Sequence, residues 1–285
     1  MRPILATVHL RQKNANPHLQ KVCFMLRSIP KVAAAVFASF ALLTGPLPAH
    51  ATQADLDAEL EGVLKDFQAK AQPINNIARR IKWTGMSDPR LFDAMEAVLQ
   101  AHYQVDTNSD GVQYSSWLAQ ALAFSGQPKY RATLEKVLAT TESDKLRHHT
   151  QRALQVLPKF ASWNPVIAAG VEAAPTADIP KQRASNMLKA EDPELMHAGV
   201  ILVLDHFLSD AAVTDLMRDR LVARYKQADN NPALAKTLAS ACKVLGQTGN
   251  SSYVPTLDAV AAYTKRSTLK RWAGWAGRRL KKLNG

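Results

Sequence analysis

The chain contains few cysteine, glycine and aromatic residues. Two cysteines in 285 residues are too few for a disulfide framework. Twelve glycines and an aromatic content of 7% are too little for an all-β chain built on many tight turns. Hydrophobic residues nevertheless make up 47% of the sequence, which is enough for a sizeable core, so we expect a globular chain of one large domain or two small ones.

Acidic residues are absent from residues 1–51, which carry six lysine or arginine residues. The apolar run Val32–Leu43 follows these basic residues, and Ala49-His50-Ala51 comes after it. A basic segment, a short apolar segment and an A-x-A site are typical of a secretory signal peptide. About twelve helical residues span roughly 18 Å, short of the roughly 30 Å core of a bilayer, which disfavours the alternative of a retained anchor.

We therefore expect cleavage after Ala51, which leaves a mature chain 52–285 that begins at Thr52 and is periplasmic or secreted. Met25 would open a signal peptide of ordinary length and is an alternative start. Residues 52–285 contain no apolar stretch of 18 residues, so we expect no membrane span in them.

Beyond residue 52 the apolar residues recur at helical spacings, and no stretch alternates apolar and polar residues for long enough to form a sheet. Short polar, Gly or Pro segments separate the helices, so sequential helices are expected to pack antiparallel. Asp88-Pro89 and Asp192-Pro193 are predicted to open helices, because Asp accepts free N–H groups there and Pro fits the first turn. Asp144 is predicted to open another. The predicted fold class is all-α.

The sequence also matches itself. A shift of 123 residues superposes residues 117–157 on 240–280 without a gap, and 123 is three units of 41, a period of HEAT-like helical repeats. The pairs that coincide in this match include Leu122/Leu245, Gly126/Gly249, Tyr130/Tyr253, Thr133/Thr256, Leu134/Leu257, Val137/Val260, Ala139/Ala262, Leu146/Leu269, Ala153/Ala276 and Leu157/Leu280. We expect the two segments to be equivalent helical pairs, with Leu134 and Leu257 both buried.

Residues 118–157 resemble one HEAT repeat, with a Gly-containing turn before the A helix and an Asp-containing turn before the B helix, near Arg147, Arg152 and Ala153. Residues 240–283 resemble a second repeat and 179–207 a partial one, whereas 52–85 and 158–178 resemble the family least. The resemblance implies a right-handed α-α superhelix of antiparallel helix pairs over 52–285, a HEAT-like solenoid whose B helices line a concave face. Tetratricopeptide-like or other helical pairs are the alternative.

Asp106, Asn108 and Asp110, followed by Gly111, match the first half of a calcium-binding loop, in which oxygens at positions 1, 3 and 5 bind the ion. The twelfth position is Trp117 where a calcium loop has a bidentate Glu, so two ligands are missing. The alternative is a loop of Asx turns that joins two helices.

No motif nominates an active site. The histidines beyond residue 51 form no H-E-x-x-H, and the phosphate-loop, dinucleotide and nucleophile-elbow motifs are absent. Cys242 lies on an apolar helical stretch, which predicts a buried and inert thiol. We therefore expect no enzyme activity, no cofactor, no metal beyond the calcium-like loop, and we identify no small-molecule substrate.

Residues 265–285 carry eight lysine or arginine residues and no acidic residue, whereas residues 52–264 carry 22 basic and 24 acidic residues. On a helical wheel the apolar face holds Leu269, Trp272, Ala276 and Leu280 and is expected to pack on the preceding helices. The candidates for binding a partner or an anion, all expected to be exposed, are Arg271, Trp275, Arg278, Arg279, Lys281 and Lys282. The alternative is structural, because the last repeat, 240–283, needs a polar outer face and cations complement the C-terminal helix dipole.

These patterns favour an exported, non-catalytic scaffold or adaptor that binds a protein partner in the cell envelope. The alternative is a peripheral envelope protein that holds an anionic lipid or polymer through its basic C-terminal helix. A HEAT-fold enzyme, such as a DNA glycosylase or a chromophore lyase, is a third hypothesis. It is disfavoured because export separates the chain from the genome, and positive charge confined to one terminal helix suits a duplex poorly, so no nucleic acid is expected.

Overall fold

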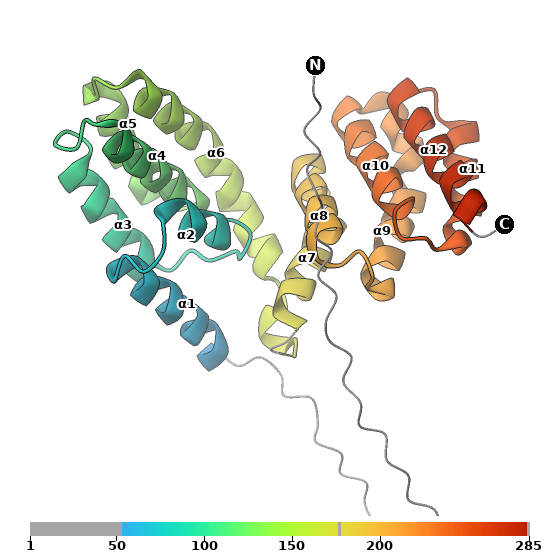
Figure 1. The fold of residues 1–285 in the computed structure, drawn as a ribbon, viewed down its shortest axis with the longest axis horizontal. Helices are drawn as coiled ribbons and strands as arrows, with labels where there is room; N and C mark the ends of the chain where they lie inside the picture. The colour runs from blue at the N-terminus through green and yellow to red at the C-terminus, as the bar shows by residue number, and fades with distance from the viewer. Residues whose placement is uncertain (1–52, 176–177, 284–285) are drawn as a thin grey trace, which may run out of the picture. The chain divides into compact units, whose positions relative to one another are not determined.

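The computed structural model describes residues 53–175 and 178–283, so the predicted signal peptide 1–51, its cleavage site and Met25 lie outside the described residues. The described residues form twelve α-helices and no strand, which confirms the all-α prediction (Figure 1). The helices are α1 (Gln53–Gln68), α2 (Ile74–Ile81), α3 (Pro89–His102), α4 (Ser109–Phe124), α5 (Arg131–Thr140), α6 (Asp144–Ala168), α7 (Ile179–Lys189), α8 (Pro193–His206), α9 (Ala211–Arg224), α10 (Pro232–Leu245), α11 (Val254–Tyr263) and α12 (Ser267–Leu283).

No helix among the described residues is both long and apolar enough to cross a membrane. Short 3₁₀ turns lie between some of the helices, at Pro128–Tyr130 (η1), Val171–Ala173 (η2), Tyr225–Asn230 (η4) and Ser251–Tyr253 (η5).

All three predicted helix starts are confirmed, and an aspartate caps the helix at two of them. The Asp88 carboxylate accepts the N–H of Arg90 at the start of α3, and Asp192 accepts the N–H groups of Glu194 and Leu195 at the start of α8. Helix α6 also begins at the predicted residue, Asp144, but its cap is the Ser143 side chain, which accepts the N–H of Leu146, and not the Asp144 carboxylate. A serine hydroxyl satisfies the same free N–H groups as a carboxylate.

Helix α6 is longer than the repeat that it resembles. It continues through Pro158 and Pro165 to Ala168, although a proline removes a helical N–H donor. The extension buries Phe160, Trp163 and Ile167 in the same core as the first half of the helix. Burial of three large apolar side chains offsets the hydrogen bonds lost at the prolines.

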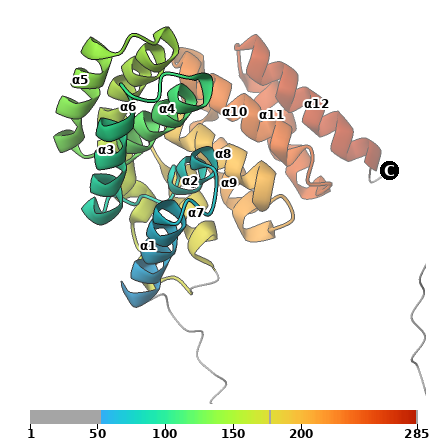
Figure 2. The same ribbon diagram turned by 60° about the vertical axis from the view of Figure 1, so that its left-hand side comes forward.

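Successive helices pack in two series. Helices α2, α4 and α6 contact one another in that order, as do α8, α10 and α12, and we call these six the even helices. Most of them also pack on the preceding odd-numbered helix, as α12 does on α11, beside which it lies in Figure 2. The core consists mainly of two large clusters, one centred on α2–α6 and the other on α8–α12. This alternation of paired helices is compatible with a helical repeat.

The 123-residue match corresponds to two equivalent sets of elements, which we call the first copy (α4, η1, α5 and α6) and the second copy (α10, η5, α11 and α12). The bounds of η1 and η5, and those of α5 and α11, differ by 123 residues at both ends, and α6 and α12 begin 123 residues apart. Leu134 and Leu257 are both fully buried, as predicted.

The turn that leads into η1 and η5 is built in the same way in both copies. Ser125 and Thr248 each donate to the carbonyl three residues before and accept the N–H two residues after, and the glycine that follows has a φ of 67° or 77°. Thr84-Gly85, before α3, repeats this turn 41 residues ahead of Ser125-Gly126. The 41-residue period is therefore seen in the backbone conformation as well as in the sequence.

Tyr130 and Tyr253 have no exposed surface and occupy matching environments, as predicted. The hydroxyl of Tyr130 donates to Asp93 of α3 at 2.7 Å, and that of Tyr253 donates to Asp215 of α9 at 3.1 Å. Burial, followed by the carboxylate contact, raises the pKa of Tyr130, and burial also raises the pKa of Tyr253. Each ring thus ties an η turn to the preceding odd helix.

Candidate functional site

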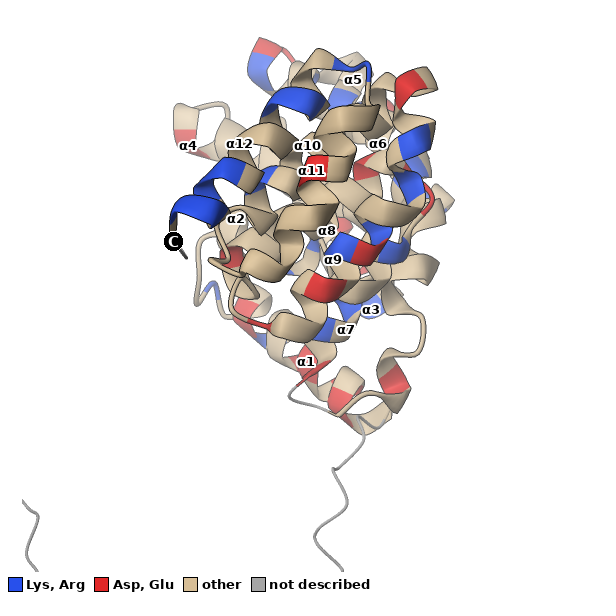
Figure 3. Cartoon of the chain, turned by 90° about the vertical axis from the view of Figure 1, so that its right-hand side faces the viewer, with Lys and Arg blue, Asp and Glu red and all other residues tan. Residues whose placement is uncertain are grey.

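Helix α12 has the predicted apolar face. Leu269, Ala273, Ala276 and Leu280 are fully buried against α10 and α11. The predicted basic face is exposed at Arg271, Arg278, Arg279, Lys281 and Lys282. Figure 3 shows blue residues along α12 and no red ones.

The prediction that Trp275 is exposed is wrong. Trp275 and Trp272 are both half-buried, pack against the second core cluster and lie 5.5 Å apart, edge to face. The reason is Gly246 at the end of α10, where an added Cβ would lie 3.0 Å from the Trp275 ring and 2.7 Å from Ala276. The absence of a side chain there lets the indole lie against the neighbouring helix, which a wheel of α12 alone does not show.

The basic candidates of α12 differ in their partners. Arg279 donates from Nε to the carbonyl of Gly246 at 3.0 Å, and Lys281 forms a 2.8 Å salt bridge with Asp258 of α11. The guanidinium of Arg271 lies over the Trp272 ring. Arg271, Arg278 and Lys282 form no salt bridge within the described part of the chain, and neither does the exposed Lys270, so these four cations of α12 remain available to an anion.

The calcium-like loop joins α3 to α4. The Asn108 side chain accepts the N–H groups of Asp110 and Gly111 and thereby caps α4, and Asp106 lies 2.6 Å from the Nδ1 of His102. Asp110 lies in the first turn of α4. Across residues 53–175 and 178–283, no group of three His, Cys, Asp or Glu side chains is placed to hold a metal ion. This geometry corresponds to the Asx-capped helix junction that was the alternative interpretation.

Cys242 is fully buried on α10, as predicted, and burial raises the pKa of its thiol well above the ordinary value. A thiol with a raised pKa is protonated at neutral pH and is a poor nucleophile.

The largest charge feature of the structure is the distribution of charge between the helix series. The even helices carry fourteen lysine or arginine residues against four acidic ones, Asp110, Asp144, Glu194 and Asp205, all in first or last turns. The odd helices carry ten basic and eleven acidic residues. Positive charge is therefore concentrated on α2, α6, α10 and α12 of the even series, since α4 and α8 carry no lysine or arginine, whereas the prediction from the sequence was of α12 alone.

A second cationic region lies on α6 and at the C-terminal end of α2, beside α4. We call it the recessed cation patch and define it by Arg79, Lys82, Lys145, His148, His149 and Arg152. Lys82 is half-buried, with its Nζ 4.5 Å from the centre of the Trp83 ring and 5.6 Å from that of Phe124. Burial, followed by repulsion from Arg152, lowers the pKa of Lys82.

His149 has a polar contact as well as cationic neighbours. It contacts Gln120 of α4 at 3.3 Å, and burial followed by repulsion from His148, Lys145 and Arg152 lowers its pKa. In the second copy Lys243 and Trp272 take the places of Gln120 and His149, with the Lys243 Nζ 5.3 Å from the ring centre. The same contact between consecutive even helices is thus kept with different chemistry. This patch was not predicted from the sequence, because Lys82 and Arg152 are 70 positions apart and only the packing of α2, α4 and α6 brings them together.

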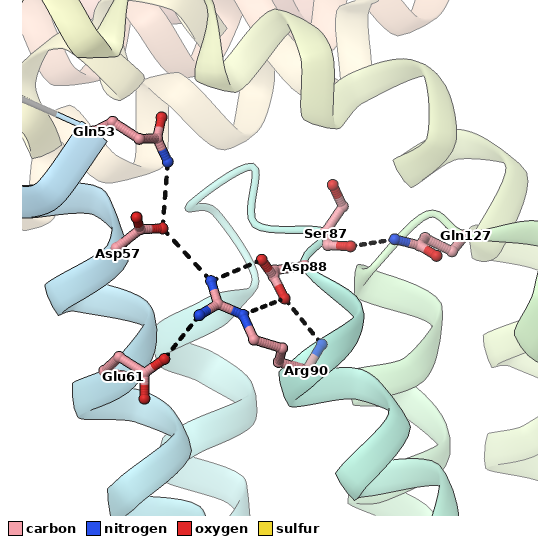
Figure 4. Close-up of polar contacts among 7 residues, drawn as sticks. All are labelled: Gln53, Asp57, Glu61, Ser87, Asp88, Arg90 and Gln127. Atoms are coloured by element: carbon pink, nitrogen blue, oxygen red, sulfur yellow. Dashed lines mark hydrogen bonds and ion pairs between the residues drawn. The ribbon is translucent and has the colours of Figure 1, made fainter.

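Arg90 shows the opposite arrangement (Figure 4). Its guanidinium meets Glu61 at 2.9 Å, Asp88 at 3.0 Å and Asp57 at 3.5 Å, which joins α1 to α3. The hydrogen bond to Asp88 is the first cause that raises the pKa of Arg90 and lowers that of Asp88. Three carboxylates satisfy this arginine, so its role is to hold two helices together.

An open cleft of about 280 Å³ lies beside α1 and is lined by Glu59, Gly85 and Arg183 among other residues. Arg183 binds Glu59 through both guanidinium Nη atoms, at 2.9 and 2.7 Å. This internal ion pair occupies two of the charged side chains that line the cleft.

Comparison of the chain with protein-family models, with curated proteins and with solved structures finds no match in any of the three.

Proposed function

We propose that this protein is an exported, non-catalytic helical-repeat protein that binds a protein partner in the cell envelope through its even helices. The observation that carries the proposal is the concentration of cations on the even helices, in a chain whose paired helices repeat at 123 residues. Repeats that stack paired helices bind partners through extended surfaces rather than through one enclosed site.

The finer architecture belongs to the same proposal. If the chain is a HEAT-like right-handed superhelix over residues 52–285, the even helices are its B helices and line the concave face. The cleaved segment 1–51 and a mature N-terminus at Thr52 would place it in the periplasm or outside the cell. N-terminal sequencing of protein from the envelope fraction tests the location, and an uncleaved cytoplasmic product would contradict it.

Photo-crosslinking in intact cells tests the binding face. A photoreactive amino acid is placed at Gln151 of α6 or Lys243 of α10, and, as matched controls, at Ala132 of α5 or Ala262 of α11, all four of which are exposed. We expect one specific envelope protein to be crosslinked from the even positions and not from the controls. Crosslinking from the controls alone, or from none of the four positions, contradicts the proposal.

A second candidate function is the binding of anionic lipid or polymer through α12. It is favoured by Arg271, Arg278 and Lys282, which are exposed and form no salt bridge within the described residues. The half-buried position of Trp275 argues against insertion of that ring into a lipid surface. Each cation near an anionic surface contributes about 1 kcal/mol, so replacing these three by Gln should abolish vesicle binding that falls steeply with salt. Equal sedimentation of both proteins with phosphatidylglycerol vesicles would remove this candidate.

A further inference from the structure

We propose that the recessed cation patch binds an extended, acidic segment of the protein partner, one with carboxylate side chains at alternating positions. This inference rests on the proposed function and adds the place and the chemistry of the contact.

The cations of the recessed cation patch have no acidic partner among the described residues. No member of the patch forms a salt bridge within residues 53–175 and 178–283, whereas Arg90, eight positions after Lys82, meets three carboxylates. The charged neighbours of Lys82 and His149 are themselves basic, Arg152 for the former and Lys145, His148 and Arg152 for the latter. An anion placed between them would replace repulsion with attraction.

Two members of the patch are partly buried. Lys82 and His149 are half-buried, whereas the other four members of the patch are exposed, so an anion meets Lys82 and His149 only by approaching close to the helix surface. A bilayer presents its headgroups as a broad surface, which meets exposed cations such as those of α12. A carboxylate on a flexible side chain can enter between helices.

Aromatic rings lie beside two cations of the patch. Arg79 lies over the Trp117 ring at 5.5 Å and Lys82 over the Trp83 ring at 4.5 Å, and Trp83 also packs on Phe160 and Trp163. These rings hold cations in place, whereas single-stranded nucleic acid needs free ring faces on which bases stack. A guanidinium stacked on a ring keeps its N–H edge free for two parallel bonds to a carboxylate.

The separation of the helices that carry the patch suits an extended peptide. The patch runs from the end of α2 past α4 to α6, and packed helices lie about 8–10 Å apart, so the axes of α2 and α6 are at most roughly 16–20 Å apart. Side chains on one face of an extended peptide repeat every 6–7 Å or so. About six residues with alternating carboxylates therefore match the patch in length.

Fluorescence anisotropy with the mature chain tests this inference. The probe is a fluorescein-labelled peptide of six Glu-Ser repeats, and a peptide of six Gln-Ser repeats is the uncharged control. The patch variant is Lys82→Met with Arg152→Gln, in which Met keeps the apolar stem of Lys82. The matched variant is Arg131→Gln with Lys136→Gln, which removes the same charge from exposed positions of α5.

We expect the patch variant to bind the acidic peptide about tenfold more weakly or worse, and the matched variant to change affinity less than about twofold. If circular dichroism shows that the patch variant is misfolded, Arg79→Gln with Lys145→Gln, both at exposed positions, replaces it under the same expectation. Binding that survives loss of the patch, or falls equally in both variants, overturns the inference.

Two further probes carry the competing occupants. Tighter patch-dependent binding of a twelve-residue oligothymidylate overturns the inference in favour of nucleic acid, and patch-dependent sedimentation with phosphatidylglycerol vesicles overturns it in favour of lipid. Crosslinks from the even positions together with failure of the peptide would leave the proposed function standing and remove this inference alone.

Discussion

The first and second copies of the helical unit share their turns and core but differ on the face of their even helices. Gly126 and Gly249, Tyr130 and Tyr253 keep the same conformation or environment. The His149 position on that face is occupied by Trp272 in the second copy, and Gln120 corresponds to Lys243. The interior is held constant because it builds the unit, whereas the surface is free to acquire different binding chemistry.

The largest effects should come from the shared core. Leu134→Ala and Leu257→Ala remove equivalent, fully buried side chains, so each should lower the free energy of unfolding by about 2–5 kcal/mol. Urea denaturation of the single variants measures both. A cost of less than about 1 kcal/mol for one of them would contradict the equivalence of the copies.

Substitution of the two equivalent glycines should lower the free energy of unfolding by different amounts in the two copies. Gly126 and Gly249 both have positive φ, but a Cβ at Gly126 would lie 2.6 Å from the backbone of α6, whereas a Cβ at Gly249 meets nothing within 4 Å. Gly249→Ala should therefore cost about 1–2 kcal/mol from backbone strain alone. Gly126→Ala should cost roughly 1–3 kcal/mol more, because α6 must also shift. Equal melting temperatures for the two variants would show that the second copy is as tightly packed there as the first.

Removal of the two equivalent tyrosine hydroxyls should lower the free energy of unfolding by similar, smaller amounts in the two copies. Tyr130→Phe and Tyr253→Phe each remove a hydrogen bond to an aspartate of the preceding odd helix and leave the buried ring in place, and Tyr253→Phe also removes a 3.0 Å hydrogen bond with Thr214. Each should cost about 1 kcal/mol in urea denaturation. A cost confined to one copy would mean that the matching contact in the other contributes nothing.

The smallest effect separates His149 from Trp272. Burial and the cations Lys145, His148 and Arg152 lower the folded-state pKa of His149, so the unfolded chain binds a proton more readily than the folded one. The contribution to stability is complete above the ordinary histidine pKa of about 6.5 and is lost as the pH falls through the lowered folded-state value. His149→Gln should reduce this acid-side loss of melting temperature, whereas Trp272→Phe should leave the pH profile unchanged. An unaltered profile for His149→Gln contradicts the electrostatic account of the patch.

The regular parts of this fold could be predicted from the sequence because they depend on neighbours in the chain. Asp88 and Asp192 act on N–H groups two or three residues away, and the offset of 123 is visible as matching letters. The extension of α6 was not predicted, since its prolines argue locally for an end while Phe160 and Trp163 are buried by other helices.

The candidate site could be predicted only in part for the same reason. The basic face of α12 follows from a helical wheel, but the burial of Trp275 depends on Gly246 of another helix. The recessed cation patch depends on α2 and α6 lying on either side of α4, and no local pattern connects Lys82 to Arg152.

Lysine acetylation footprinting of the mature chain tests the central claim, that the even helices form the binding face, most directly. Lys82 and Lys145 belong to the recessed cation patch, whereas Lys129 and Lys181 lie outside the even helices and pair with Asp93 and Asp210. With the Glu-Ser peptide added, mass spectrometry should show protection of Lys82 and Lys145 and unchanged labelling of Lys129 and Lys181. Protection of Lys129 or Lys181, with Lys82 and Lys145 labelled as in the free chain, would contradict the account.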